Sequence, residues 1–241
     1  MVLTPSEARA FYDRFGKKQD AQSFYENPAL DDLIAHARFA EAARVLEFGC
    51  GTGRLAARLL AECLPDSATY IGFDISPTMV NLATQRLAPY AERAQVFQSD
   101  GTTNLPLADN SVDRVIATYV LDLLSDTDIG EVLREAHRVL IVGGKVCLVS
   151  LTTGTTFPSR VVAFVWTAIF RLRASLVGGC RPIRLRRALS PSCWELEHGR
   201  VLSAFGVASE VLVATARDST QPCVAAVAAE KAGQQRNRMD G

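Results

Sequence analysis

The sequence lacks the usual features of metal-binding, secreted and membrane-spanning proteins. It has six cysteines but no Cys-x-x-Cys pair, and only three histidines, so neither a zinc site nor a disulfide framework is expected. Residues 1–10 contain neither the basic nor the apolar part of a secretory signal. The longest apolar run, Val161–Phe170, has about half the length of a bilayer-spanning helix. These absences predict a cytoplasmic protein that holds no metal.

An excess of either charge is also absent. Lys and Arg together number 26, as do Asp and Glu, in a chain of 241 residues with ordinary globular composition. The distribution is uneven, however, because residues 151–194 contain no Asp or Glu. A locally basic segment indicates an anionic partner. Its arginines are Arg160, Arg171, Arg173, Arg181, Arg184, Arg186 and Arg187.

Short apolar segments alternate with helical patterns through the middle of the chain. Alternation with short links predicts a parallel sheet with helices on both faces, joined by right-handed crossovers. Strands are expected at 44–48, 69–73, 94–98, 112–117 and 145–150. Helices are expected at 55–64, at 76–87 after a Ser-Pro start, and at 126–140, where Gly143-Gly144 would stop the helix.

The two ends depart from this alternation. Residues 6–39 read as helices broken at Asn27-Pro28, and 194–205 reads as a helix closed by Gly206. Two later apolar runs are too close for a helical crossover and predict an antiparallel hairpin. They are 207–215 and 223–229.

The expected fold is a doubly wound α/β sheet of seven strands, mostly parallel, with an antiparallel C-terminal hairpin. The chain length fits one such domain with additions. The expected divisions are a helical cap at 1–39, a ligand-binding domain at 40–231 with a basic and apolar insert at 151–194, and a flexible tail at 232–241.

The first strand ends in the loop Glu47-Phe48-Gly49-Cys50-Gly51-Thr52-Gly53. Glycines permit a sharp turn and let a ligand approach the backbone, and the helix that follows favours anionic groups. A dinucleotide fingerprint has the spacing Gly-x-Gly-x-x-Gly and disfavours an acid beside its pyrophosphate. Here the spacing is Gly-x-Gly-x-Gly, Arg54 follows, and Glu47 can hold a cationic amino group. S-adenosylmethionine (SAM), which carries a carboxylate and an ammonium, fits this loop better than a dinucleotide.

The segment Val45–Arg54 resembles motif I of the class I, Rossmann-like, SAM-dependent methyltransferases, and the resemblance extends over about residues 40–230. The alternative is that the segment is only a structural glycine turn between a strand and a helix. The resemblance implies SAM as the cofactor and places an acid at the end of the second strand on the SAM ribose. The SAM-binding residues that it implies are Glu47, Gly49, Cys50, Gly51, Gly53, Asp74, Ile75, Met79, Asp100, Gly101 and Thr118.

Each supporting acid also has a plain structural interpretation. Asp74 can cap the next helix, and Asp100-Gly101 can be a simple turn. The resemblance instead implies that Ile75 and Met79 pack on the adenine, and that Asp100 contacts its amino group. It also implies that the backbone after the fourth strand, around Thr118, meets the methionine part of SAM.

The sequence singles out no catalytic base. Asp122 and Tyr12 are the candidates, with His137 and His198 as further possibilities within expected helices. Many members of the family carry His where Asp122 stands, and an acceptor amine that is already neutral needs no base. The N-terminal aromatics Tyr12, Phe15 and Tyr25 either cover SAM or pack among the helices.

The insert at 151–194 bears on the acceptor. Arginines flank the apolar run Val161–Phe170, an arrangement that resembles an interfacial helix at an anionic membrane surface; the alternative is a lid. The expected activity is methyl transfer to a small or lipid-like acceptor. The alternatives are methylation of a soluble metabolite or a non-catalytic SAM-binding module. No Asn/Asp-Pro-Pro-Tyr/Phe motif is present, so nucleic acid is not expected as the partner, and the oligomeric state is not indicated.

Overall fold

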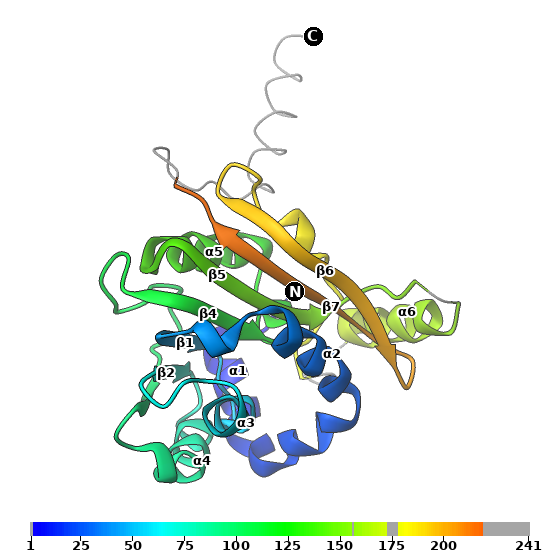
Figure 1. Cartoon of the computed structure of the whole chain (residues 1–241). Coiled ribbons are helices and arrows are strands. Elements are labelled where there is room, and N and C mark those ends of the chain that lie inside the picture. The colour runs from blue at the N-terminus through cyan, green and yellow to red at the C-terminus, as the bar shows by residue number, and fades with distance from the viewer. Residues whose placement is uncertain (1, 156, 173–177, 219–241) are drawn as a thin grey trace, which may run out of the picture.

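The computed structural model describes residues 2–155, 157–172 and 178–218. Their centre is a seven-stranded sheet with the order β3-β2-β1-β4-β5-β7-β6 (Figure 1). The strands β1 to β5 are parallel, and β7 lies antiparallel between β5 and β6. The strands are β1 Arg44–Phe48, β2 Thr69–Asp74, β3 Ala94–Gln98, β4 Val112–Thr118, β5 Leu140–Leu151, β6 Trp194–Ala204 and β7 Val207–Ala216. The doubly wound sheet with an antiparallel hairpin is therefore confirmed.

The helices begin where the sequence supplies a cap. Ser76 accepts a hydrogen bond from Met79 N at the start of α4, and Ser125 accepts one from Asp128 N at the start of α5. The α-helices are α1 Pro5–Phe15, α2 Ser23–His36, α3 Arg54–Glu62, α4 Pro77–Arg86, α5 Asp126–Val139 and α6 Phe157–Leu172. The 3-10 helices are η1 Gly16–Gln22, η2 Phe39–Glu41, η3 Ala88–Tyr90, η4 Leu121–Leu123 and η6 Leu185–Arg187.

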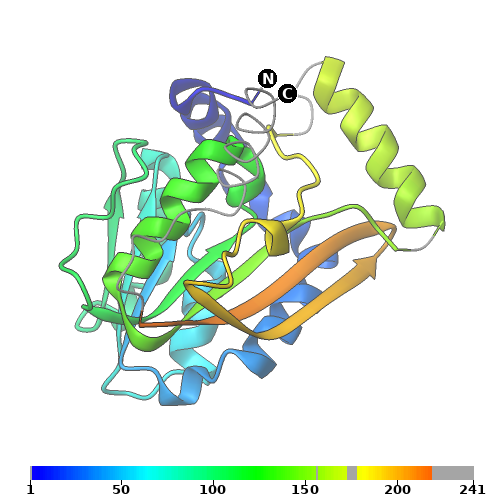
Figure 2. The ribbon, with the colours of Figure 1, turned by 90° about the horizontal axis from the view of Figure 1, so that it is seen from above.

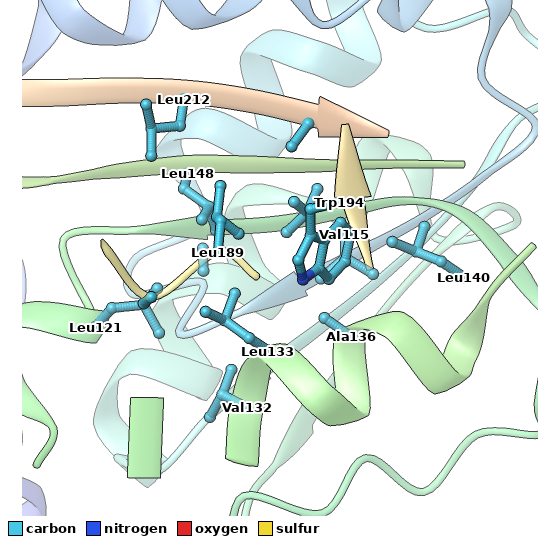
Figure 3. Packing of buried hydrophobic residues seen from close by; sticks show 14 of the residues in the cluster. Val115, Leu121, Val132, Leu133, Ala136, Leu140, Leu148, Leu189, Trp194 and Leu212 are labelled. Atoms are coloured by element: carbon cyan, nitrogen blue, oxygen red, sulfur yellow. The ribbon is translucent and has the colours of Figure 1, made fainter. Parts of the chain in front are cut away.

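Two hydrophobic cores lie on opposite faces of the sheet. The neighbours Val115 and Ile116 of β4 point to different cores, as alternate residues of a strand must. Figure 3 shows the first core, where Leu133 of α5 lies near Val115 and Trp194. The second core contains residues of α2 and α3. Because both faces are covered, the central strands read as continuous apolar runs.

The prediction of a helix at 194–205 is wrong. Residues 194–204 form β6, which pairs with β7 from Trp194 to Ala204 with a register shift between Leu196 and His198. Exposed Glu195 and Glu197 alternate with the half-buried Leu196, which is the pattern of an edge strand with one wet face. Phe205 and Gly206 have φ values of 51° and 82°, so Gly206 serves a two-residue hairpin turn and does not end a helix. The hairpin thus precedes the expected one, and the run 223–229 and the tail 232–241 lie outside the described residues.

Two boundaries also differ from the sequence expectation. The helix α2 continues through Pro28, which removes one backbone donor without ending the helix. The helix α5 ends at Val139 and β5 starts directly at Leu140. Gly143-Gly144 therefore lies within β5, where Gly143 has a φ of 81° and the register with β4 shifts.

Cysteine chemistry departs from expectation at one position. Cys193 is disulfide-bonded, whereas Cys50, Cys63, Cys147 and Cys180 are free thiols. The expectation that the chain has no disulfide is therefore wrong. Among the described residues, no helix has both the length and the apolar character that crossing a membrane requires.

Candidate cofactor and acceptor site

A cavity of about 390 Å³ lies where the carboxyl ends of β1, β2 and β4 meet. The strand order reverses between β1 and β4, which is where ligands bind in doubly wound sheets. The sheet side is lined by Phe48, Gly49, Phe73, Asp74, Ile75, Ser99, Gly101, Thr118, Tyr119 and Val120. The N-terminal segment covers the cavity with Val2, Leu3, Pro5, Ala8, Tyr12 and Gln19.

The glycine loop is shaped by its own backbone. Gly49 N and Cys50 N donate to Phe73 O at 2.8 and 2.9 Å, which fixes the turn against β2. Gly49 has a φ of 76°, and a Cβ there would lie 2.6 Å from Val120 Cγ2. Only glycine combines this conformation with so close an approach. Gly51 and Gly53 also have positive φ, and Gly53 leads into α3.

Glu47 lies beneath the loop rather than in the lining of the cavity at the strand ends. Its side chain is 1% exposed, and Tyr70 Oη donates to its Oε2 at 2.6 Å. Burial raises the pKa of Glu47 to about 8 despite this hydrogen bond. The buried Cys50 shares a small adjoining pocket with it. Burial therefore favours the neutral form of Glu47 over the carboxylate.

Asp74 lines the cavity at the strand ends and also holds the loop. Its Oδ2 accepts from Gly51 N and its Oδ1 from Ser76 N, both at 2.9 Å. Burial raises the pKa of Asp74, while these backbone donors oppose the shift. Each oxygen keeps a second lone pair, so the carboxylate can still accept from ligand hydroxyls.

The remaining expected cofactor residues separate into two groups. Ile75, Gly101 and Thr118 line the cavity, whereas Met79 is fully buried outside its lining. Asp100 is exposed at the rim, and its Oδ1 accepts from Thr102 N and Thr102 Oγ1. These hydrogen bonds correspond to the simple turn that the sequence left open, and they lower the pKa of Asp100.

The N-terminal segment is tied to the loop by charged contacts. Thr52 Oγ1 donates to Asp20 Oδ1 at 2.6 Å, and Arg86 donates to both carboxylate oxygens of Asp20. Ser76 Oγ donates to Asp13 Oδ1 at 2.6 Å. The cap therefore touches the first two turns of the binding site through side chains that the sequence did not single out.

Two further residues at this cavity were also missed. Gln19 Oε1 is buried and has no hydrogen-bond partner within the described part of the chain, and it lies 2.9 Å from where a Cβ on Gly51 would be. Tyr119 has a φ of 53°, an uncommon conformation that turns the chain after β4 toward the cavity. Neither feature has a local sequence signal. Of the expected aromatic cover, Tyr12 lines the cavity, whereas Phe15 and Tyr25 do not.

Asp122 lies in η4, between two stretches that line the cavity. Its side chain is 0% exposed, Leu151 N donates to Oδ2 at 3.2 Å, and Oδ1 has no partner in the described structure. Burial raises the pKa of Asp122 to about 7. Tyr12 Oη and Cys180 Sγ lie 4.0 Å apart, and the charge of Asp122 contributes to raising the pKa of both groups.

The two histidine candidates lie elsewhere. His137 is on α5, where its Nε2 is 3.1 Å from Arg217 O. His198 is on β6 rather than on a helix, and its Nε2 is 2.6 Å from Asp32 Oδ2. Neither lines the cavity at the carboxyl ends of the strands. The structure therefore leaves Asp122 and Tyr12 as the titratable candidates beside this cavity.

The insert forms a separate surface around α6, which Figure 2 shows at the periphery beside the ends of β6 and β7. A groove of about 1210 Å³ runs between α6, η6 and the segment that follows β5. Four arginines line this groove, and none has a carboxylate within 4.0 Å in the described ranges. These arginines are Arg160, Arg184, Arg186 and Arg187. Glu210 is the one acidic residue of the lining in the described ranges. We call this groove, with the exposed apolar side chains of α6, the α6 surface; those side chains are Phe157, Val161, Phe164, Val165 and Leu172.

Comparison with known proteins finds a family match for the central part of the chain, which contains the glycine loop. Residues 45–144 match the family model described as a methyltransferase domain. The chain is 30% identical over 122 residues to the ubiquinone/menaquinone biosynthesis C-methyltransferase UbiE of Geotalea uraniireducens (50% of each chain). It is 32% identical over 162 residues to the malonyl-[acyl-carrier protein] O-methyltransferase of Laribacter hongkongensis (62% of this chain, 52% of that protein). The chain thus spans about half the length of the curated relatives it matches.

Solved structures share the fold at lower identity. The [4+2]-cyclase SpnF superposes with a TM-score of 0.63 at 14% identity, over 90% of this chain and 98% of that one. A geranyl diphosphate C-methyltransferase from Streptomyces coelicolor A3(2) gives 0.60 at 15% identity, over 80% and 79%. A cyclase and a methyltransferase share this fold, so these likenesses show the architecture alone. Residues 45–144, which hold the glycine loop and Asp74, thus match a methyltransferase domain, and the chain is similar to SAM-dependent methyltransferases over about half of its length or more.

Proposed function

We propose that this chain transfers the methyl group of SAM to a small or lipid-like acceptor at an anionic membrane surface. The observation that carries the proposal is the cavity at the β1–β4 switch point, with Asp74 in its lining and Gly49 against Val120. In this proposal residues 1–39 are a cap, 151–194 bind the acceptor, and 40–231 bind SAM. Nucleic acid is not proposed as the substrate.

The residues present fit SAM. Asp74 has lone pairs left for the two ribose hydroxyls, and Ile75 and Gly101 form an apolar wall for the adenine. Gly49 and Thr118 line the cavity at the ends of the neighbouring strands β1 and β4, where we place the methionine part of SAM. Gln19 Oε1 is a buried acceptor that has no donor among the described residues, and the ammonium group of SAM supplies one. Glu47 lies behind the loop as a second acceptor for that charge.

The reaction is an in-line displacement at the methyl carbon. When bound, SAM supplies a methyl group on a positively charged sulfur. The task of the chain is to align the acceptor atom behind that carbon and to keep water out. The cap keeps water out, because Pro5, Ala8 and Tyr12 lie over the cavity. The sheet helps to align the reacting groups by fixing Gly49 and Thr118 at the ends of neighbouring strands.

The α6 surface favours a lipid-like acceptor over a soluble metabolite. Phe164 is 73% exposed and Phe157 is 81% exposed, although large apolar side chains are rarely grouped on a free surface. Arginines that have no carboxylate within 4.0 Å in the described ranges line the groove beside them. An apolar face next to such cations is the composition of a helix that lies in the headgroup region of a membrane.

Cofactor binding is tested by calorimetry with SAM, S-adenosylhomocysteine and NAD. The first two are expected to bind, and binding of NAD without SAM contradicts the proposal. Asp74→Ala and Glu47→Ala are expected to abolish SAM binding, whereas Asp66→Ala, which removes an exposed carboxylate remote from the cavity, leaves it unchanged. Radiolabelled SAM offered with lipid and soluble extracts then identifies the acceptor class. Label that appears in the soluble fraction alone favours the metabolite alternative, with 151–194 as a lid.

A further inference from the structure

Two of the three histidines in the chain lie face to face outside the cofactor cavity. His36 is the last residue of α2 and His198 lies on β6, and their rings stack with centroids 3.6 Å apart and planes 8° apart. Asp32 lies one helical turn before His36 on the same face of α2, and its Oδ2 is 2.6 Å from His198 Nε2. One carboxylate oxygen and one nitrogen from each ring all lie within 4.8 Å of one another.

A register shift in β6 turns His198 toward α2, which packs against this edge of the sheet (Figure 1). Leu196 packs against the first hydrophobic core and Leu202 against the second, although residues an even number apart in a regular strand share one face. The pairing with β7 shifts between Leu196 and His198, and such a bulge exchanges the two faces. His198 and Arg200 therefore share the α2 side with Leu202, and both contact Asp32.

The Asp32 carboxylate is buried beside imidazoles rather than beside a buried cation. Its side chain is 6% exposed, whereas Arg200, which donates to Oδ1 at 3.2 Å, is 61% exposed. An ion pair with so exposed a partner contributes little, and buried charges are otherwise found on metals. His36 Nδ1 also lies 2.7 Å from Asp32 O, a backbone contact of the kind that orients metal-binding imidazoles.

We infer that Asp32, His36 and His198 bind one divalent transition-metal ion, and that zinc suits them best. Imidazole nitrogens and carboxylate oxygens are ligands of zinc, and three protein ligands leave a fourth position for water. Ligand atoms about 2.0–2.1 Å from a tetrahedral ion lie about 3.3 Å apart, so the 2.6 Å pair has to open by less than about 1 Å. The exposed His36 ring has to tilt out of its stack so that a nitrogen faces the ion.

The ion joins the N-terminal cap to the edge of the sheet, because α2 belongs to the cap and β6 is the last strand. None of the three ligands lines the cofactor cavity, so the role is structural and does not depend on the proposed function. Cysteine spacing predicts no zinc site, but it does not bear on this one, whose ligands on α2 and β6 lie up to 166 residues apart. Such ligands come together only in the folded chain, and the ion therefore stabilises the fold.

Zinc binding is measured by calorimetry on the whole chain without a histidine tag. One ion per chain is expected, and the midpoint of thermal unfolding is expected to rise by about 5–10 °C when free zinc exceeds the dissociation constant a hundredfold. In NMR spectra zinc is expected to shift the ring resonances of His36 and His198. The ring of His137, which lies on α5 with its Nε2 3.1 Å from Arg217 O, serves as an internal control and is expected not to shift.

Substitutions then assign the ligands. His36→Gln and His198→Gln are each expected to lose about a hundredfold or more in zinc affinity, since loss of a mere orienting partner already costs about ten- to hundredfold. His137→Gln is the matched control and keeps the wild-type affinity. Arg200→Gln is expected to raise zinc affinity, because it removes a cation that repels the ion. An Asp32 that serves only as the partner of Arg200 predicts no zinc binding in either protein.

Three results overturn the inference. Zinc that binds wild type, His36→Gln and His198→Gln equally is an adventitious ion only. Loss of binding in Cys63→Ser, with binding retained in His36→Gln, places the ion on that free thiol. A wild type that binds no zinc removes the site directly. If Asp32→Asn does not fold, the exposed His36 decides in its place, because unchanged affinity in folded His36→Gln contradicts the site. SAM binding and methyl transfer are measured separately, so none of these results touches the proposed function.

Discussion

Thr52 Oγ1 donates a 2.6 Å hydrogen bond to Asp20 Oδ1, which joins the glycine loop to the N-terminal cap. Arg86 completes the contact by binding Asp20 and also Thr52 O. The loop, the cap and α4 are therefore connected at one carboxylate. Because the cap also covers the cavity, we expect cofactor binding to depend on whether residues 5–22 are held in place by this contact.

Removing this carboxylate is expected to weaken SAM binding. Asp20→Ala deletes charge-assisted hydrogen bonds worth about 1.5–3 kcal/mol, which corresponds to roughly a ten- to hundredfold loss of affinity if the cap must close over SAM. Calorimetry with SAM measures the loss. Hydrogen exchange of residues 5–22 is expected to rise in the same variant.

The matched control is Asp31→Ala on α2. Asp31 pairs with Arg58 of α3 and does not touch the loop, so this variant removes a cap contact without reaching the cavity. Its SAM affinity is expected to equal that of wild type. An equal loss in both variants means that the cap acts through general stability rather than through the loop.

Gly49→Ala is expected to abolish SAM binding. An added Cβ would lie 2.6 Å from Val120 Cγ2, and it would also meet the left-handed backbone, whose cost for an L-residue is about 1–2 kcal/mol. Gly143→Ala separates the two effects, because Gly143 has a φ of 81° but nothing within 4 Å of a Cβ. It is expected to lower stability by about 1 kcal/mol with SAM binding intact. Partial recovery in Gly49→Ala/Val120→Ala assigns the remainder to the clash, and no recovery argues against it.

The sequence predicts the sheet centre well and its edge poorly, for one physical reason. Strands such as β4 are buried on both faces, so their apolar runs exclude surface helices. The edge strand β6 has one wet face, contains Gly199 and carries a register shift between Leu196 and His198. Its mixed pattern resembles a surface helix, and only its pairing with β7 shows that it is a strand.

The same distinction holds for the site. The glycine spacing and Asp74 are local signals, since a turn and a strand end are set by neighbours in the chain. Gln19 and Asp20 reach the loop through tertiary packing, which no local pattern records. The orientation of Asp100 depends on Thr102, which donates to its carboxylate. The sequence shows that Thr102 is present but does not show whether Asp100 binds Thr102 or a ligand.

Glu47 is expected to make stability fall as pH rises toward 8. The folded chain holds the Glu47 proton up to about pH 8, whereas the ordinary pKa is 4.5. Between these values the folded state binds more protons than the unfolded state, so the free energy of unfolding decreases with rising pH. The decrease is on the order of a few kcal/mol, because a tenfold difference in proton affinity between the two states corresponds to about 1.4 kcal/mol. Asp122 contributes below about pH 7, and the buried thiols of Cys50, Cys147 and Cys180, whose pKa burial raises above 9.0, contribute in the same direction above about pH 8. The interval from pH 7 to pH 8 therefore reports mainly Glu47.

Glu47→Gln is expected to flatten the unfolding curve in that interval. Glu41→Gln, an exposed carboxyl, leaves the wild-type slope. Calorimetry at pH 7 in buffers of different ionisation enthalpy adds a functional measurement. If the SAM ammonium pairs with the Glu47 carboxylate, binding releases a proton from wild type and none from Glu47→Gln. Equal proton release in both places the ammonium elsewhere, with Gln19 as the remaining acceptor.

The α6 surface is expected to bind anionic vesicles. Sedimentation with phosphatidylcholine vesicles, with and without phosphatidylglycerol, should show binding that needs the anionic lipid and weakens with salt, because arginines near a charged membrane contribute about 1 kcal/mol each. Arg184→Gln and Arg186→Gln are each expected to weaken binding about fivefold, whereas Arg134→Gln on α5 has no effect. Phe164→Glu should abolish the apolar contribution to vesicle binding. Phe97→Glu on β3, at the opposite edge of the sheet, serves as its control. Binding that ignores both lipid charge and these arginines assigns the α6 surface to a lid instead, since a lid requires no anionic partner.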